Sequence, residues 1–437
     1  MITQRTYAER RSRVLDAIGH GAAFVLAASP ELHIGHDTEL RYAIDPELWY
    51  LTGYAEPEAV LVLRPSDDEP VFTLFVRPRD PERETWTGGR GGVEAARDAF
   101  SADDARSITE LNEHLPKLLS QVDTVYARLD SGRPAVDAVI AAALRGARRS
   151  RPRTGKGPFV LIDPGSVLSE LRLFKEPAEV RAIREAARIT VESFIDAAAR
   201  IRAGAGEWLI EAALDGGFRS RGAAGPAFPT IVASGPNATV LHHVSNDRIM
   251  TGDDLVLVDA GARKDMYCAD ITRTFPVSGG FRGAGGAIYE IVLAAHDAAI
   301  AAVHPGATVR SVHDAAQRVL VEGMIALQLV TGDVDALIEQ EKPVTAWYPH
   351  RTSHWLGLDV HDVGDYVSGG GPRVLEPGMV LTIEPGLYVP AHAEDSPAAL
   401  RGIGVRIEDD VLVELDGRDV LTSALPVRPA DIAALVN

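Results

Sequence analysis

The chain has 437 residues, of which 46% are hydrophobic and 24% are charged, which is the composition of a globular protein long enough for two domains. Acidic residues outnumber lysine and arginine by 62 to 44, and the formal net charge of −18 repels nucleic acid and anionic membranes. These values exclude a disordered chain and argue against a nucleic-acid-binding protein.

Cys268 is the only cysteine, so one chain can form no internal disulfide and no thiolate zinc site. Residues 1–19 (MITQRTYAERRSRVLDAIG) are charged where a signal peptide would be apolar, and no run of about 18 apolar residues occurs. We therefore expect a cytoplasmic protein.

Predicted strands and helices alternate in the first third of the chain. Residues 135–145 have a helical pattern, and short β-rich runs are bounded by proline, glycine or aspartate. These runs lie at residues 22–28, 59–65, 70–78 and 159–164. The pattern predicts an α/β domain over residues 1–170.

A basic segment at residues 145–157 (RGARRSRPRTGKG) contrasts with the acidic composition. Its six basic residues could bind a polyanion, but its prolines and glycines favour a solvated loop or domain edge. We therefore expect neither nucleic acid nor a membrane as a partner.

A second domain is predicted over residues 171–437, with the boundary near residues 165–176. Pro177 suits the first turn of a helix. Apolar residues at close to a 3.6-residue spacing predict a long amphipathic helix over residues 179–201.

A faint internal repeat is present in this second domain. The similar segments are residues 202–213 with 304–316, and residues 251–261 with 377–386. Each half would supply two helices and an apolar strand that ends on an acid, Asp259 or Glu384. A duplicated half-domain with its cleft on the pseudo-twofold axis is therefore a hypothesis.

Asp259 and Asp270 stand at neighbouring strand ends. Asp259 ends the run LVLV and Asp270 begins the next β-rich run, so a hairpin or adjacent strands would bring the two carboxylates together. Buried carboxylates are costly unless they are paired or bind metal. For either acid alone, pairing with Arg273 or Arg263 is the alternative.

Two further acids occur near the C-terminus. Glu384 ends the apolar run MVLTI, and Glu408 follows Arg406 by two residues, so both side chains would lie on one face of a predicted strand, GIGVRIEDDVLV. An acid in so apolar a strand is hard to explain as a surface residue. Together with the two aspartates, these acids require cations.

Three histidines lie within residues 350–364 (HRTSHWLGLDVHDVG). Four carboxylates and one histidine balance two divalent ions, and oxygen-rich ligation favours Mn²⁺, with Co²⁺ and Zn²⁺ as alternatives. One histidine should be a ligand and the other two should face the substrate. His350 and His354 have the zincin spacing, but Arg351 stands where that motif requires glutamate.

Several segments together resemble the signature blocks of the pita-bread metallopeptidases, and most of all their Xaa-Pro aminopeptidase (aminopeptidase P) branch. These segments are DAGARKDMYCADITRTFPV, HRTSHWLGLDVHDVG, TIEPGLY and GVRIEDD. Weaker similarity in WYLTGYAEPEAVLVL and LRLFKEPAEV extends over nearly the whole chain. The resemblance implies an α/β (α+β) fold, in which a creatinase-like N-terminal domain precedes a pita-bread catalytic domain.

The resemblance also implies a dinuclear metal centre, in which Asp270 and Glu408 bridge the ions. The implied ligands are Asp259, Asp270, His354, Glu384 and Glu408. The implied reaction is release of the N-terminal residue from peptides with proline second, by attack of a metal-bridging hydroxide.

Other site residues carry implied roles in this resemblance. Glu384 would be the general acid/base, while His243 and His361 would contact the substrate and stabilise the tetrahedral intermediate. His350 would line the cleft, and Arg406 would orient the carboxylates beside it.

The sequence departs from the family pattern at two places. Arg351 replaces a glycine that commonly follows the first histidine, so the cleft near His350 would be narrower or more basic. Trp86 matches a tryptophan that reaches a neighbouring subunit's active site, although its flanking residues diverge. A homodimer or homotetramer is implied, with the N-terminal domain mediating assembly and forming a cleft wall.

Two other functions compete with this one. A prolidase shares the fold and the ligands but accepts only dipeptides. A non-catalytic peptide-binding module of the same fold lacks a complete metal set, whereas all five ligand positions are filled here.

Overall fold

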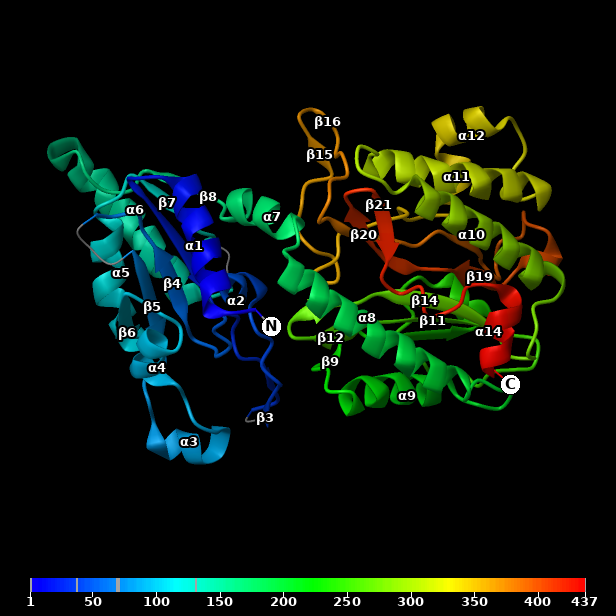
Figure 1. Cartoon of the computed structure of the whole chain (residues 1–437), viewed down its shortest axis with the longest axis horizontal. Helices are drawn as coiled ribbons and strands as arrows, with labels where there is room; N and C mark the ends of the chain where they lie inside the picture. The colour runs from blue at the N-terminus through cyan, green and yellow to red at the C-terminus, as the bar shows by residue number, and fades with distance from the viewer. Residues whose placement is uncertain (1, 37, 68–70, 130–131, 437) are drawn as a thin grey trace. The chain divides into compact units, whose positions relative to one another are not determined.

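The computed structural model describes residues 2–36, 38–67, 71–129 and 132–436 (Figure 1). The chain divides into two compact units, Met1–Leu171 and Arg172–Asn437, which we call unit 1 and unit 2. The sequence led us to expect domains over residues 1–170 and 171–437.

Unit 1 is built on a mixed six-stranded sheet with the order β6-β5-β4-β1-β7-β8. The strands are β1 (Ala22–Ala27), β4 (Val60–Leu63), β5 (Phe72–Val76), β6 (Asp104–Ser107), β7 (Thr124–Tyr126) and β8 (Val160–Ile162). β1 pairs antiparallel with β4 and parallel with β7. The four predicted strands are thus present, although the first residue of the 70–78 prediction lies outside the described residues.

Helices and a separate short hairpin accompany this sheet. The helices are α1 (Gln4–Ile18), α2 (Pro46–Thr52), α3 (Pro81–Thr87), α4 (Gly92–Asp98), α5 (Leu111–Leu119), α6 (Pro134–Thr154) and α7 (Gly165–Leu173), and the hairpin strands are β2 (His33–Ile34) and β3 (Thr38–Glu39). Val25, Val62 and Phe75 from the sheet are buried against Leu115 of α5 and Ile140 of α6.

The basic segment at residues 145–157 is helical up to Thr154, so the predicted loop is wrong. Arginines in the last turn interact favourably with the negative end of the helix dipole, and α6 ends at Gly155, which has φ 68°. The prediction that the segment is solvated is confirmed, because most of its side chains are exposed.

Unit 2 contains long helices in two pairs. Its helices are α8 (Pro177–Ala198), α9 (Glu207–Ser220), α10 (Gly283–Ala302), α11 (Val309–Ala326), α12 (Val334–Gln340), α13 (Lys342–Thr345) and α14 (Pro429–Val436). α8 confirms the predicted amphipathic helix: Pro177 occupies its first turn, a capping box joins Glu176 and Glu179, and Ile183 and Phe194 are buried.

Short antiparallel sheets make up the β structure of unit 2. The strands are β9 (Gly225–Pro226), β10 (Ile231–Ser234), β11 (Leu255–Ala260), β12 (Ala262–Lys264), β13 (Tyr267–Cys268), β14 (Ile271–Pro276), β15 (Val367–Ser368), β16 (Gly371–Pro372), β17 (Val380–Ile383), β18 (Gly386–Val389), β19 (Ile403–Arg406), β20 (Asp409–Glu414) and β21 (Gly417–Val420). The sheet orders are β10-β11-β14, β13-β12-β9, β17-β20-β21, β18-β19 and β15-β16.

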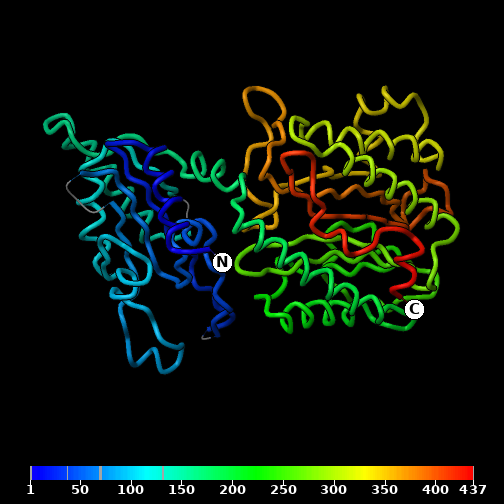
Figure 2. Tube along the Cα trace, viewed as in Figure 1, coloured from blue at the N-terminus to red at the C-terminus, as the bar shows by residue number. Residues whose placement is uncertain are grey.

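The predicted repeat of two helices followed by an apolar strand is present. α8 and α9 pack with β11 and β14 around one apolar core, and α10 and α11 pack with β17 and β20 around another. Figure 1 shows the two helix pairs on opposite sides of the strands, and the trace in Figure 2 shows α14 returning beside α8 at the C-terminus. This sandwich is the pita-bread fold.

α10 is the one helix among the described residues that is long and apolar enough, by length and composition alone, to cross a membrane. The core helix of a soluble protein passes the same test. Glu290 and Asp297 interrupt its apolar sequence, while Ile288, Tyr289 and Val292 are buried in the core that it shares with α11. We interpret α10 as a core helix.

The predicted strand around Arg406 and Glu408 is broken between β19 and β20. β19 pairs with β18, whereas β20 pairs with β17, so the chain changes partner at Ile407 and Glu408. At this break the Glu408 N–H donates to the carbonyl oxygen of Thr272 on β14. The side chains of Arg406 and Glu408 still both line one cavity.

Candidate metal centre

A cavity of about 270 Å³ in unit 2 collects most of the predicted site residues. Its polar lining includes Asp259, Asp270, His350, His354, His361, Glu384, Arg406 and Glu408. The cavity therefore brings together all five predicted metal ligands, two of the three predicted substrate histidines of unit 2, and Arg406.

The first half of the repeat places two carboxylates. Asp259 lies in β11, whose antiparallel partner β14 sets Asp259 opposite Thr272, two residues after Asp270. The predicted neighbouring strands are thus confirmed. The short hairpin β12–β13 lies between β11 and β14 in the chain. After it, the Asp270 N–H donates to Asp410 Oδ2 at 3.1 Å.

The second half of the repeat places His354 and Glu384. The chain around His354 runs beside β17: the His354 N–H donates to Thr382 Oγ1, and the Glu384 N–H donates to the carbonyl of Thr352. Glu384 directly follows β17, as predicted. The two side chains consequently enter the cavity together.

His354 Nε2 stands at the centre of the carboxylates. It lies 3.4 Å from Asp270 Oδ2, 3.6 Å from Glu384 Oε1 and 4.0 Å from Glu408 Oε1. Asp270, His354 and Glu408 each offer one metal-ligand atom, and these three atoms lie within 4.8 Å of one another. This spacing is compatible with a shared metal ion.

The protonation of His354 suits a metal ligand. Its Nδ1 lies 3.1 Å from the carbonyl oxygen of Trp355, which can only accept, so Nδ1 carries the hydrogen. The Nε2 lone pair then faces the carboxylates. Burial lowers the pKa of His354 to about 4, so the ring stays neutral at pH 7.

The carboxylates repel one another where they are buried. Burial, and then the charge of Glu408, raises the pKa of Asp270 well above its ordinary value, and burial raises that of Glu384 to about 8. Among the described residues, Asp259 Oδ1 and Asp270 Oδ1 are buried without a hydrogen-bond partner. Divalent cations would relieve both costs, so the donor set fits the metal ions that the sequence implies.

Arg406 is the one cation in direct contact with this carboxylate cluster in the described part of the chain. Its Nη2 donates to Asp259 Oδ2 at 2.6 Å, its Nε to Thr272 Oγ1 and its Nη1 to Tyr388 Oη. Thr272 Oγ1 in turn donates to Glu408 Oε2 at 2.7 Å. The guanidinium thus orients two predicted metal ligands, one of them through Thr272.

His350 is held by a hydrogen-bond chain. Its Nδ1 lies 2.8 Å from the carbonyl of Arg351, which fixes the hydrogen on Nδ1, so Nε2 accepts from Tyr388 Oη at 2.8 Å. Burial, and then the charge of Arg406, lowers the pKa of His350 to about 3. His350 lines the cavity as a neutral imidazole.

The remaining histidines differ from one another in position. The His361 ring packs edge-on against that of His354, with centroids 4.4 Å apart, and lines the cavity. Of the adjacent pair His242 and His243, it is His242 that lines the cavity. His243 Nε2 instead lies 3.2 Å from Glu207 Oε2, with little of its side chain exposed. The structure therefore favours His242 over the predicted His243 as the residue that faces the cavity.

A second group, Glu207, His243 and Asp247, also has a spacing compatible with a metal. Its chemistry differs, because both oxygens of Glu207 already accept hydrogen bonds from neutral donors. A metal ion would have to displace these donors, whereas the carboxylates of the first group have free lone pairs. The first group is therefore the candidate metal centre.

The alternative pairings considered for the aspartates are wrong. Arg273 Nη2 bonds Asp409 Oδ1 at 2.8 Å, and Arg263 Nη2 donates to the carbonyl of Leu358. Asp409 follows directly on Glu408, so the Arg273 pair anchors the chain beside a predicted ligand.

Asp362 is buried in an ion cluster. Lys175 Nζ donates to its Oδ2 at 2.9 Å, and Arg172 Nη2 contacts its Oδ1. All three side chains are almost completely buried. This cluster fixes the residue that follows His361.

Two predicted side chains lie outside this cavity. Trp86 belongs to α3 of unit 1 and is 86% exposed. Arg351 is exposed, and its Nη1 lies 3.4 Å from His313 Nε2 of α11. The substrate role of Trp86 and the effect of Arg351 on the cleft stay predictions.

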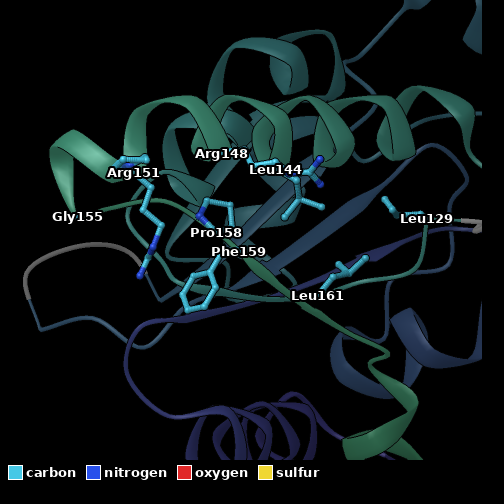
Figure 3. A pocket seen from close by; sticks show the side chains of 9 residues that line it. Leu129, Leu144, Arg148, Arg151, Gly155, Pro158, Phe159 and Leu161 are labelled. Atoms are coloured by element: carbon cyan, nitrogen blue, oxygen red, sulfur yellow. The ribbon is translucent and has the colours of Figure 1, made fainter.

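Unit 1 carries a larger hollow of about 740 Å³ on its surface (Figure 3). Leu144, Arg148 and Arg151 of α6 and Phe159 and Leu161 at β8 line it. Its lining is apolar and basic, so it offers neither the acids nor the imidazoles that the predicted chemistry requires.

Sequence reasoning missed Thr272, Tyr388, Glu207 and Asp410. Thr272 lies in the segment ADITRTFPV and Tyr388 in the segment TIEPGLY. Alternation along the strand places Thr272 on the same face as Asp270, and this signal could have identified it. Glu207 carried no such signal, because its partners lie 27 to 41 residues away.

Comparison with known proteins connects both units to one family. Residues 181–414 match the model of metallopeptidase family M24, and residues 7–126 match that of the aminopeptidase P N-terminal domain. The chain is 39% identical over 436 residues to the Xaa-Pro aminopeptidase of Escherichia coli K12, covering 100% of this chain and 98% of that protein. It is 32% identical to human Xaa-Pro aminopeptidase 3, covering 100% of this chain and 86% of that protein.

Solved structures agree with these matches. Pseudomonas aeruginosa aminopeptidase PepP is 41% identical and superposes with a TM-score of 0.94, covering 100% of this chain and 99% of that chain. A zinc-substituted E. coli aminopeptidase P in complex with product is 39% identical, with a TM-score of 0.94 and coverage of 100% and 98%.

Proposed function

The chain belongs to metallopeptidase family M24, and from this premise we propose that it is an Xaa-Pro aminopeptidase, which releases the N-terminal residue from peptides with proline in second position. One observation carries the proposal: His354 Nε2 presents its lone pair to Asp270, Glu384 and Glu408 in a cavity that also holds unpaired oxygens of buried carboxylates. A divalent cation bound there would satisfy both this lone pair and these oxygens.

Two divalent metal ions would be held by the five predicted ligands, with Asp270 and Glu408 shared between them. These ligands are Asp259, Asp270, His354, Glu384 and Glu408. When bound, such a pair lowers the pKa of water and polarises a carbonyl group. We propose Mn²⁺ because four of the five ligands are carboxylates, with Co²⁺ and Zn²⁺ as alternatives. Zinc occupies the related E. coli structure, by substitution.

Glu384 is the proposed proton carrier. The imide nitrogen of an Xaa-Pro bond has no hydrogen, so proline can leave as an amine only if a proton is delivered to that nitrogen. Glu384 lines the cavity beside the other carboxylates, so its carboxylate is placed to take up a proton and deliver it to that nitrogen.

His242 and His361 are the proposed donors to the carbonyl oxygen as negative charge develops on it. Both line the cavity. Arg406 would act as a positioning residue, because it holds Asp259 directly and Glu408 through Thr272. His350 would form a cleft wall fixed by Tyr388.

An apolar wall beside these groups offers a surface for the proline ring. Phe228, Pro229, Ile231, Leu241 and Val244 line the cavity together with the carboxylates and imidazoles. A rigid, apolar ring loses little conformational entropy on binding such a surface, which supports proline as the recognised residue.

The N-terminal unit is proposed to mediate assembly into a homodimer or homotetramer and to contribute to a cleft wall. Trp86 exposes 86% of its large apolar side chain, which fits a contact with another subunit. A reducing, cytoplasmic location is proposed because Cys268 is the single cysteine.

Comparing the tripeptide Ala-Pro-Ala with the dipeptide Ala-Pro tests the proposal. An Xaa-Pro aminopeptidase releases alanine from the tripeptide. A prolidase leaves the tripeptide intact and cleaves the dipeptide, and a binding module cleaves neither. Release of alanine from Ala-Pro-Ala but not from Ala-Ala-Ala supports selection of proline in second position.

A further inference from the structure

We propose that Glu207 is a positioning residue of the active site, which holds the wall segment at residues 241–244 and with it His242 in place. This inference rests on the proposed function, because it names a residue that acts on the same site. Glu207 begins α9 and is completely buried, and its carboxylate does not line the cavity that His242 faces.

Both carboxylate oxygens of Glu207 are occupied by donors from one stretch of chain. Oε1 accepts from the N–H and Oγ of Ser234 at 2.6 and 2.7 Å, and from Asn237 Nδ2 at 3.1 Å. Oε2 accepts from the Arg248 N–H at 3.0 Å and lies 3.2 Å from His243 Nε2. Burial alone would raise the pKa of Glu207, but hydrogen bonds, that from the Arg248 N–H foremost, hold it below its ordinary value.

These donors bracket the cavity wall. Ser234 and Asn237 precede the wall segment, while His243 lies within it and Arg248 follows it. Leu241, His242 and Val244 of this segment line the cavity. Glu207 therefore joins both ends of the segment and one residue inside it to the first turn of a long helix.

The segment depends on such side-chain contacts. Residues 240–248 lie outside any helix or strand, so no regular backbone ladder fixes them. Asn246 supplies a second attachment, since its side chain accepts from the Val232 N–H and donates to the Thr230 carbonyl. Within the wall segment His243 contacts Glu207, and Ser234, Asn237 and Arg248 attach the chain to Glu207 on either side of it.

His243 transmits the constraint to its neighbour. Because His243 is drawn toward Glu207, the preceding side chain, His242, is directed to the cavity. The adjacent histidines thus have separate tasks, one as an anchor and one as a cavity residue.

Glu207→Gln is the informative substitution, because glutamine keeps the volume and replaces one acceptor oxygen by an NH₂ donor. In either orientation this NH₂ meets a backbone N–H, that of Ser234 or that of Arg248. Asn237→Ala is a milder variant that removes one donor from a partly buried position. Asp247→Asn is the matched control, since Asp247 is exposed and belongs to the same metal-compatible group.

The experiment combines kinetics and hydrogen exchange on the full chain loaded with Mn²⁺. We expect Glu207→Gln to lower kcat/KM for Ala-Pro-Ala at least tenfold with unchanged metal stoichiometry, and to increase deuterium uptake in peptides covering residues 234–248. Asn237→Ala should shift both readouts in the same direction by less. Asp247→Asn should match the wild type, and loss of bound metal in that variant would instead favour a metal site at Glu207.

A double variant decides whether Glu207 acts through His242. If it does, Glu207→Gln combined with His242→Ala is no more than about twofold worse than His242→Ala alone. The inference is overturned if the losses of kcat/KM in the two single variants multiply in the double variant. It is also overturned if deuterium uptake in residues 234–248 of Glu207→Gln stays at the wild-type level. Wild-type protein that releases no alanine overturns the proposed function instead, and the exchange measurement then decides the positioning claim by itself.

Discussion

Arg406 Nη2 donates to Asp259 Oδ2 across 2.6 Å, and this ion pair connects the two halves of the repeat. Asp259 lies in β11 of the first half and Arg406 in β19 of the second. The proposed metal ligands come from both halves, so their spacing depends on contacts of this kind. The guanidinium also donates hydrogen bonds to Thr272 and Tyr388. A smaller cation could not contact all three partners at the same time.

Arg406→Lys should weaken metal binding. A lysine ammonium can reach one of the three partners but cannot reproduce the planar fork, so Asp259 and Thr272 lose their fixed orientation. We expect the affinity for Mn²⁺ to fall about 10- to 100-fold, as is typical when a partner of a metal ligand is removed. Chelator competition measures this affinity. Arg418→Lys, at an exposed position in β21, is the control, and equal affinities in both variants would contradict the role of Arg406.

Metal-stripped protein should become more stable as the pH falls from about 8 toward 5. The folded state raises the pKa of Glu384 to about 8, and those of Asp270 and Glu408 well above their ordinary values. Carboxyl groups with raised pKa bind protons more tightly when folded, so their stabilising contribution is present at low pH and is lost as the pH rises through about 8.

Bound metal should reverse this trend, because it removes the repulsion that raises these pKa values. Thermal unfolding of stripped and Mn²⁺-loaded protein at pH 5, 6, 7 and 8 measures both effects. The gain in Tm from metal should be largest at pH 8. A gain that is independent of pH would show that the buried carboxyls are not protonated in the stripped protein.

Asp362→Asn should destabilise the protein by about 3–5 kcal/mol, because it leaves the buried ammonium of Lys175 without its carboxylate and removes one of the two carboxylates that contact Arg172. Lys175 and Arg172 hold the pKa of Asp362 below its ordinary value against the effect of burial. The stabilisation is therefore present above about pH 4 and is lost as the pH falls below that value. Asp359→Asn, at a side chain that is 39% exposed, should cost less than about 1 kcal/mol.

Urea unfolding at pH 7 and at pH 3 distinguishes these variants. The difference between wild type and Asp362→Asn should shrink at pH 3, because the unfolded chain then binds a proton at Asp362 more readily than the folded protein does. If Asp362→Asn and Asp359→Asn lost similar amounts of unfolding free energy at pH 7, burial would not determine how much these ion pairs stabilise the protein.

Cys268 should be inert toward thiol reagents in the folded protein. Its side chain is buried, and burial raises the pKa of the thiol to about 12, so almost no thiolate is present at pH 8. A chromogenic disulfide should report one thiol per chain in denaturant and close to none without it. Rapid modification of the native, metal-loaded enzyme would contradict this burial.

The sequence predicted those parts of the site that rest on strand ends. Asp259 and Glu384 each follow apolar β-branched runs, and the period of two along a strand makes their direction predictable. The histidine cluster was visible because its residues are close in sequence. In each case a local pattern fixes the position of the side chain.

Contacts between distant segments could not be predicted in the same way. The sequence offered Arg273 and Arg263 as partners for the aspartates, but β14 pairs with the chain at residues 406–408, and this places Arg406 at Asp259 and Arg273 at Asp409. The resemblance implied His243 as a substrate residue, and its contact with Glu207, 36 residues away, could not be predicted from the local sequence. The end of α6 was misjudged because Pro152 and Gly155 predict a loop, whereas a proline at that point is accommodated within the helix.

The most direct test is hydrolysis of Ala-Pro-Ala by metal-stripped protein, with and without added Mn²⁺, beside Asp270→Ala treated identically. Asp270 and His354 lie together at the candidate metal centre, so the account predicts that Mn²⁺ restores alanine release in the wild type and fails to do so in the variant. Alanine release by stripped wild-type protein, or by Asp270→Ala with Mn²⁺ at the wild-type rate, would contradict it.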